Sequence, residues 1–288
     1  MATTYNDLTL NIRRALHEAG FPDATLEARE LVCFAAGKSR EELTRDARLY
    51  APPALEAYAW ELAKRHLAGE PVAYLIGEWE FYGVPLDISR DVLIPRPDTE
   101  TLVEEVLREL PQNEEHRILD LCSGSGCIGI SLACHLPASR VVLGEISDGA
   151  LRVCRQNIRR NGLTGRVVAL YADALQKPDR ALGEFTCVTC NPPYIPHGEI
   201  ETLDVSVRDY EPHLALDGGA DGLDFYRAVC AEWKGVLAAG GRLFFEVGAG
   251  QADAVLRLMR AQGFGDVEVA KDKNGIPRVV HGALCDEI

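Results

Sequence analysis

A tetrapeptide of unusual composition, Asn191-Pro192-Pro193-Tyr194, follows an apolar run that predicts a strand, Phe185–Cys190. The two prolines stiffen the backbone and present carbonyl oxygens, because proline has no N–H to donate. Asn191 adds a side-chain acceptor and two donors, and the Tyr194 ring offers a flat wall. These groups suit a planar nitrogen that carries two hydrogens, as in an amide or a nucleobase. The alternative is a strand followed by a plain proline turn.

A second motif is a loop rich in glycine and serine, between an apolar strand and an expected helix. Its residues are Cys122, Ser123, Gly124, Ser125 and Gly126. Because glycine has no Cβ, Gly124 and Gly126 let the main chain bend sharply and approach a ligand closely. Ligands of open α/β sheets lie beyond the carboxyl ends of the strands, often at the first crossover. Residues 124–129 also satisfy the dinucleotide pattern GxGxxG, so the loop alone does not select the ligand.

Two acidic residues end the next two predicted strands. Glu145 lies about 20 residues beyond the glycine loop, where an acid can accept hydrogen bonds from both ribose hydroxyls of a nucleoside cofactor. Asp173 lies where the amino group of an adenine is expected, or it caps a helix that comes next. The adjoining Ala174 belongs to the same predicted contact region.

A proline-flanked arginine precedes the α/β region. Pro95 and Pro97 fix an extended backbone around Arg96, and Glu100 follows at the start of a predicted helix. A rigid arginine followed by an acid is one way to build the wall of a binding site. A plain surface position is the alternative for Arg96.

The chain around these motifs alternates predicted strands and helices, which is typical of a parallel sheet with helices on both faces. The expected strands are Arg117–Cys122, Arg140–Ile146, Arg166–Ala172, Phe185–Cys190 and Gly241–Val247. The expected helices are 126–136, 148–161, 224–238 and 251–262. Two closing runs predict an antiparallel hairpin, Val267–Ala270 and Val279–Leu284.

Three regions are predicted along the chain. Apolar residues follow helical spacing in the first, 1–78, which predicts a small helical domain that docks a substrate. Within it, Ser39 and Glu42 have the spacing of a capping box. A short β-hairpin linker is expected at 79–94 because aromatic residues flank a turn there. The α/β domain is expected at 95–288.

The composition argues against several classes of protein. A formal net charge of -14, from 30 basic and 44 acidic residues, disfavours a direct nucleic-acid target. No apolar run is long enough to span a membrane and no secretory signal is visible, so we expect a cytoplasmic protein. We also expect it to be a monomer. The nine cysteines lie mostly in apolar stretches, which predicts reduced, buried thiols. Cys187 and Cys190 match CxxC formally, but they lie in a strand, and we expect no metal site.

Several segments resemble the HemK/PrmC family, the protein-(glutamine-N5) methyltransferases of peptide chain release factors. They are Pro71–Glu100, the Ser123–Gly126 loop, the NPPYIP sequence that begins at Asn191, and Arg208–Pro212. The resemblance extends over nearly the whole chain. The chain departs from the family pattern at Cys122-Ser123, where Gly-Thr is usual, and at Glu145, where Asp is commoner.

The resemblance implies a class I methyltransferase fold, with a Rossmann-like seven-stranded sheet behind an N-terminal helical domain. It implies S-adenosylmethionine (SAM) as cofactor and the glutamine of the Gly-Gly-Gln motif of release factors as target. The expected cofactor-binding residues are Cys122, Ser123, Gly124, Ser125, Gly126, Glu145, Asp173, Ala174 and Asn191. The expected catalytic residues are Asn191, Pro192, Pro193 and Tyr194, and the substrate-binding set adds Arg96 and Glu100.

Two other functions stay open from the sequence. Nucleic-acid N-methyltransferases use the same Asn-Pro-Pro-Tyr pocket, although the acidic composition disfavours them here. A catalytically silent SAM-binding module is the other alternative, and the intact Asn191 and glycine loop argue against it. In the favoured mechanism, the Asn191 Oδ1 and the Pro192 carbonyl hold both N–H groups of the target amide, and water takes the proton.

Overall fold

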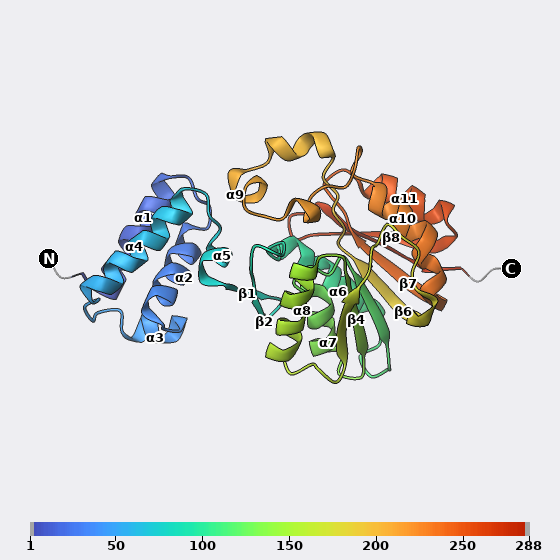
Figure 1. Ribbon diagram of the computed structural model, residues 1–288, viewed down its shortest axis with the longest axis horizontal. Helices are drawn as coiled ribbons and strands as arrows, with labels where there is room; N and C mark the ends of the chain where they lie inside the picture. Colours follow the sequence, from blue (N-terminus) through green and yellow to red (C-terminus); the bar gives the residue numbers. More distant parts are fainter. Residues whose placement is uncertain (1–2, 286–288) are drawn as a thin grey trace. The chain divides into compact units, whose positions relative to one another are not determined.

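The computed structural model describes residues 3–285, and the chain divides into two compact units (Figure 1). One unit contains the residues up to Glu78 together with a returning segment, Val205–Tyr210. The other contains Trp79–Asp204 and the residues from Glu211 onward. Among residues 3–285, no helix combines the length and the apolar character needed to cross a membrane.

The first unit is helical. Its helices are α1 (Tyr5–Glu18), α2 (Ala24–Ala36), α3 (Arg40–Arg45), α4 (Pro53–Leu67), α5 (Val72–Ile76) and, from the returning segment, α9 (Val205–Arg208). Leu8, Ile12 and Leu16 repeat every four residues along α1 and are fully buried, so this face forms the core of the unit. Ser39 and Glu42 form the predicted capping box at the start of α3.

The returning segment packs against the turn that comes after α4. Gly69 has a φ of +105°, and a Cβ at this position would lie 3.0 Å from Val205 Cγ1 and 3.6 Å from the Tyr210 ring. Glycine therefore permits both the left-handed turn and the close approach of the segment. The sequence patterns did not predict that residues so far along the chain join the helical unit.

A two-stranded hairpin, β1 (Glu78–Phe81) and β2 (Val84–Asp87), comes next and confirms the predicted β-hairpin. Its two turn residues, Tyr82 and Gly83, have φ values of 50° and 73°. Two consecutive positive φ angles are the signature of a type I′ turn, whose twist matches that of the flanking strands.

The second unit is built on one seven-stranded sheet. Its strands are β3 (Arg117–Leu121), β4 (Arg140–Glu145), β5 (Val167–Tyr171), β6 (Phe185–Cys190), β7 (Leu237–Glu246), β8 (Phe264–Lys271) and β9 (Pro277–Leu284). Their order is β5-β4-β3-β6-β7-β9-β8. The pairs from β5 to β7 are parallel, and β9 runs antiparallel to both of its neighbours. The strand order reverses between β3 and β6, so ligands are expected beyond the carboxyl ends of these two strands.

Helices cover both faces of this sheet (Figure 1). One face carries α6 (Glu100–Glu109), α7 (Cys127–His135) and α8 (Asp148–Arg160), and the other carries α10 (Asp224–Ala228) and α11 (Ala252–Ala261). Short 3-10 turns link these elements: η1 (Pro97–Thr99), η2 (Arg180–Leu182), η3 (His197–Thr202), η4 (His213–Ala215) and η6 (Lys234–Val236). A single π-helical turn, η5 (Val229–Trp233), extends α10. The fold is the class I methyltransferase arrangement that the sequence resemblance implied.

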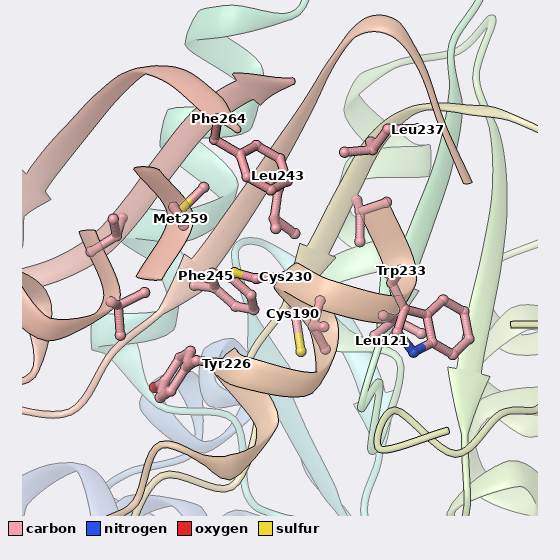
Figure 2. Close-up of a cluster of buried hydrophobic side chains, with 14 of the residues drawn as sticks. Leu121, Cys190, Tyr226, Cys230, Trp233, Leu237, Leu243, Phe245, Met259 and Phe264 are labelled. Carbon is pink, nitrogen blue, oxygen red and sulfur yellow. The ribbon is translucent and has the colours of Figure 1, made fainter. Parts of the chain in front are cut away.

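An apolar cluster fills the space between the sheet and the α10–α11 side (Figure 2). The sheet contributes Leu121, Cys190, Leu243 and Phe245, and the helical side contributes Tyr226, Trp233 and Met259. Tyr226 meets Phe245 edge to face, with ring centroids 5.1 Å apart, and its hydroxyl donates to the Glu246 carbonyl at 3.0 Å. Burying a side chain of this size contributes roughly 1.5–3 kcal/mol, so the ends of β6 and β7 are firmly held.

The expected helix 224–238 and the expected strand Gly241–Val247 are both corrected by the structure. The α-helix ends at Ala228 and continues as the π turn and a 3-10 turn, and β7 already begins at Leu237. Trp233 lies buried within the π turn and donates its indole N–H to the Ala174 carbonyl at 3.1 Å. This tertiary contact, which no local spacing reveals, accompanies the departure from α-helical geometry.

Candidate active site

The glycine loop links β3 to α7, and its two glycines serve different purposes. Cys122, Gly124 and Gly126 all have positive φ angles, of 55°, 55° and 82°. A Cβ on Gly126 would lie 2.9 Å from Leu143 Cδ1, so this position is glycine because of internal packing. A Cβ on Gly124 would meet nothing within 4 Å. Gly124 therefore borders the open side of the loop, where a ligand can approach the backbone.

Two buried side chains of α8 hold this loop from behind. Cys154 donates its thiol hydrogen to the Gly124 carbonyl at 3.0 Å. Asn157 is fully buried, and its Nδ2 donates to the Ser125 carbonyl at 2.9 Å and to the Asp87 carbonyl at 3.0 Å. The sequence interpretation missed both residues, although a polar Asn157 on the apolar face of a helix is a detectable signal.

Glu145 ends β4 directly beside the loop. Glu145 is 7% exposed, and its carboxylate accepts hydrogen bonds from the Gly124 N–H at 2.8 Å and from the Ser147 N–H at 2.9 Å. Each carboxylate oxygen has a further lone pair, so the group can still accept from a ligand hydroxyl. The structure thus brings Glu145, the residue that the sequence predicted at a ribose, together with Gly124 of the predicted cofactor loop.

Asp173 and Ala174 follow β5, the strand next to β4. Asp173 Oδ1 accepts from the Leu175 N–H at 2.9 Å, which closes a turn. No helix follows in the described chain before the short turn η2, so the helix-capping alternative for Asp173 is wrong. Ala174 is buried, and its carbonyl is occupied by the Trp233 indole.

Asp120, which the sequence interpretation missed, lies in β3 and is fully buried. Its Oδ1 accepts from the Thr189 hydroxyl at 2.8 Å and its Oδ2 from the Gly129 N–H at 3.1 Å. Burial raises its pKa to about 7, and the nearby Glu145 carboxylate acts in the same direction. The side chain ties β3, β6 and the start of α7 together below the glycine loop. An acid inside an apolar strand is the signal that would have found it.

The Asn-Pro-Pro-Tyr segment leaves β6 next to the glycine loop. Leu121 pairs with Cys190 across the parallel strands, so the residues directly after each of them are neighbours. Asn191 is half-buried, and its Nδ2 donates to the Thr99 hydroxyl at 3.4 Å. Burial raises the pKa of Tyr194 to about 12, so its hydroxyl stays protonated at neutral pH.

A second glycine-rich loop, Gly218–Gly222, lies against the back of the Asn191–Tyr194 segment. A Cβ on Gly218 would lie 2.8 Å from the Pro193 carbonyl oxygen, and one on Gly222 would lie 2.3 Å from the Tyr194 carbonyl oxygen. Gln251 reaches the same point and donates its Nε2 to the Tyr194 carbonyl at 2.9 Å. The sequence interpretation missed all three supporting residues. Their role depends on contacts between distant segments.

Arg96 and Glu100 are engaged with neighbouring protein groups. Arg96 forms an ion pair with Glu211, whose side chain is buried. Burial raises the Glu211 pKa, although Arg96 opposes this shift. Glu100 accepts from the Tyr82 N–H at 3.3 Å and lies 3.5 Å from the Lys273 ammonium. Both residues thus fix the segment ahead of α6, and any contact they make with a substrate is additional to these bonds.

His197, close to the motif in sequence, is exposed. Its Nδ1 lies 2.7 Å from Asp217 Oδ2, and this hydrogen bond raises the His197 pKa. His197 is therefore a solvated surface group.

The parallel pairing of β3 with β6 brings the glycine loop beside the Asn191–Tyr194 segment. A chain that does this at the switch point of a seven-stranded sheet with an antiparallel last strand is a class I methyltransferase. The residues at the glycine loop fit SAM. Gly124 leaves open space for a ligand, and the Glu145 carboxylate beside it can accept from ribose hydroxyls.

Comparisons with known proteins identify the family. The model of the Methyltransferase small domain matches residues 98–209, and that of the PrmC N-terminal domain matches residues 7–77. A release factor glutamine methyltransferase from Geobacter sulfurreducens is 41% identical over 274 residues, covering 94% of each chain. One from Moorella thermoacetica is 41% identical over 261 residues, covering 88% of this chain and 91% of its own. This chain belongs to the release factor glutamine methyltransferase family.

A solved structure supports the fold independently. A methyltransferase from Pyrococcus furiosus superposes with a TM-score of 0.54 at 15% identity, covering 77% of this chain and 98% of that chain. At this identity the likeness concerns the fold alone.

Proposed function

We propose that this protein transfers the methyl group of SAM to the side-chain amide nitrogen (N5) of the glutamine in the Gly-Gly-Gln motif of peptide chain release factors. The observation that carries the proposal is the pairing of β3 with β6, which sets the glycine loop beside Asn191. Membership of the family, at 41% identity over 94% of the chain, supports the choice of substrate.

An amide nitrogen is a poor nucleophile, because its lone pair is delocalised into the carbonyl group. SAM supplies an electrophilic methyl group on a sulfonium sulfur. In the proposed mechanism, Asn191 Oδ1 and the Pro192 carbonyl accept the two N–H bonds of the target amide. The Tyr194 ring lies against the face of the amide and directs the lone pair toward the methyl group. Alignment of this kind is worth roughly 7–11 kcal/mol at its upper end.

No protein base is required by this chemistry. An N-methylated amide that still carries its extra proton is very acidic, so water can accept the proton. The Tyr194 hydroxyl, with a pKa raised to about 12, stays protonated at neutral pH and is not a base in this scheme. The acceptors that hold the N–H groups also stabilise the positive charge that develops on nitrogen.

The remaining features of the proposal concern partners. We propose that the helical region 1–78 docks the release factor, that 79–94 links it to the catalytic region 95–288, and that the protein acts as a cytoplasmic monomer. A net charge of -14 supports a protein target over a nucleic acid. Arg96 and Glu100 are proposed to border the substrate while they hold the segment before α6.

The test is direct methylation of purified release factor with isotopically labelled SAM, followed by mass analysis of the Gly-Gly-Gln peptide. The expected result is one methyl group on the glutamine. A release factor in which that glutamine is replaced by glutamate is the matched control and should stay unlabelled. Label that appears in added RNA or DNA, and not in the release factor, would overturn the proposal.

The variant Asn191→Ala should bind SAM normally and lose most transfer. Without the Asn191 Oδ1 one target N–H loses its acceptor, which costs roughly 1–3 kcal/mol before the loss of alignment is added. The measurement is kcat at saturating SAM and release factor, with SAM affinity determined by calorimetry. A kcat equal to that of the parent protein would mean that other groups hold the amide.

A further inference from the structure

Glu246, at the end of β7, is a buried carboxyl group that the proposed mechanism does not use. The side chain is 3% exposed, and its Oε2 has no well-formed hydrogen bond among residues 3–285. Phe245 pairs with Cys190 across the parallel strands β7 and β6, so Glu246 and Asn191, the residues that follow them, are neighbours. The side chains of Thr99 and Asn191 favour the ionised form of the carboxyl group and lower its pKa. A buried acid costs stability unless it has a role or a partner, so its place beside Asn191 requires an explanation.

A hydrogen bond joins Asn191 to Thr99, and an ionised Glu246 beside them would give it a defined direction. An ionised carboxylate only accepts, so a Thr99 hydroxyl that bonds to Glu246 must donate its single hydrogen. The Thr99 oxygen must then accept from its other neighbour, and it does so from Asn191 Nδ2 at 3.4 Å. The NH₂ end of the Asn191 amide is thereby held toward the protein by Thr99. The other end of the same amide, Oδ1, is left for the substrate.

We propose that Glu246 is a positioning residue that sets the orientation of the Asn191 amide, acting directly and through Thr99, so that Oδ1 faces the reacting nitrogen. The inference rests on the proposed function, because the orientation of Asn191 matters only if its Oδ1 must accept an N–H of the target amide. An Asn191 amide turned the other way would place its NH₂ group against the NH₂ group of the target. That pairing has two donors and no acceptor, so the productive complex would be lost.

The charge state of Glu246 controls this orientation. Burial raises the Glu246 pKa to about 7. When protonated, the carboxyl group becomes a donor, and the direction of the hydrogen bonds through Thr99 can reverse. The charged or titratable groups around Glu246 are Asp98 before α6, Arg278 on β9, Cys127 on α7, Tyr194 after β6 and Tyr226 on α10. Burial raises the pKa of Cys127 and Tyr194 to about 12 and that of Tyr226 higher still, so none of these three titrates near pH 7.

The decisive experiment compares Asn191→Asp with the double variant Asn191→Asp, Glu246→Gln. In the single variant two carboxylates face each other, and kcat should fall at least tenfold below that of the parent. In the double variant the glutamine can donate to one aspartate oxygen while the other faces the substrate. We expect the double variant to recover at least fivefold in kcat over the single variant, with SAM affinity unchanged. Equal kcat values for the two would overturn the proposal.

Two further arms separate positioning from a structural role. Thr99→Ser keeps the hydroxyl and should keep kcat, whereas Thr99→Val removes it and should lower kcat with little change in SAM affinity. The parent kcat should rise with pH through about pH 7 as Glu246 ionises, and Glu246→Gln should abolish this rise. Glu268→Gln, at a side chain that is 62% exposed on β8, is the matched control and should behave as the parent.

Thermal unfolding of the same variants tests the contact between Glu246 and Asn191 without any substrate. The melting temperature should fall for Asn191→Asp and recover in the double variant, whether or not a release factor is methylated. Failure of the parent to methylate release factor would refute the proposed function while this arm still tests the contact. Additive changes in melting temperature, with no recovery, would overturn the coupling between the two residues.

Discussion

Replacing Gly218 by alanine tests whether the loop Gly218–Gly222 holds the Asn191–Tyr194 segment in place. An added Cβ would lie 2.8 Å from the Pro193 carbonyl oxygen, 2.8 Å from Tyr194 Cα and 2.9 Å from Gly222 Cα. All three are backbone atoms, so no flexible side chain can yield. Restoring an ordinary separation of about 3.4 Å requires a backbone shift of roughly half an ångström, and overpacking of this kind costs about 1–3 kcal/mol.

The predicted effect on catalysis comes from that displacement. Because a misplacement of about 1 Å can cost on the order of a hundredfold in rate, a shift of half that size should lower kcat by about tenfold. Single-turnover methyl transfer to release factor measures this effect, and calorimetry should show SAM affinity unchanged. Gly198→Ala is the control, because a Cβ there would meet nothing within 4 Å and its φ is not positive. A parent-like rate for Gly218→Ala would refute the argument that this loop positions the segment.

Three other substitutions probe the cofactor side. Glu145→Ala should weaken SAM binding by roughly 1.5–3 kcal/mol, since it removes an acceptor of charge-assisted hydrogen bonds, and unchanged affinity by calorimetry would remove Glu145 from the site. Asn157→Ala should lower the free energy of unfolding in urea by roughly 1–3 kcal/mol, because it removes the donor to the buried Ser125 carbonyl and to the partly buried Asp87 carbonyl; an unchanged value would contradict this. Asp120→Asn tests the raised pKa. Between about pH 4 and pH 7 the folded protein holds a proton on Asp120 that the unfolded chain has lost, so the parent loses stability as pH rises. Relative to that of the variant, the free energy of unfolding of the parent should fall by up to roughly 3 kcal/mol between about pH 5 and pH 8. The slope should be about 1.4 kcal/mol per pH unit up to about pH 7. A pH-independent difference would show that the Asp120 pKa is ordinary.

The features that sequence reasoning predicted are those encoded locally. The glycine loop and the Asn191 segment each come directly after an apolar run, and the carboxyl ends of parallel strands meet at one edge of a sheet. The residues that were missed act across the fold. Gly218 matters only because another segment lies against it, and Glu246 resembles the end of an ordinary strand until Asn191 is placed beside it. No periodicity encodes such contacts.

The two halves of the site are supported by separate sets of residues. The cofactor loop is held by Cys154 and Asn157 of α8, on one face of the sheet. The Asn191–Tyr194 segment is held by Gln251 and by the loop Gly218–Gly222. Since these supports share no hydrogen bond, weakening one should not disturb the other, and their effects should add. The buried Asp120 is the exception, because its bonds to Thr189 and Gly129 join β3, β6 and the start of α7, from which both segments are positioned. A substitution at Asp120 should therefore disturb both segments, whereas one at Asn157 or Gln251 should disturb only its own.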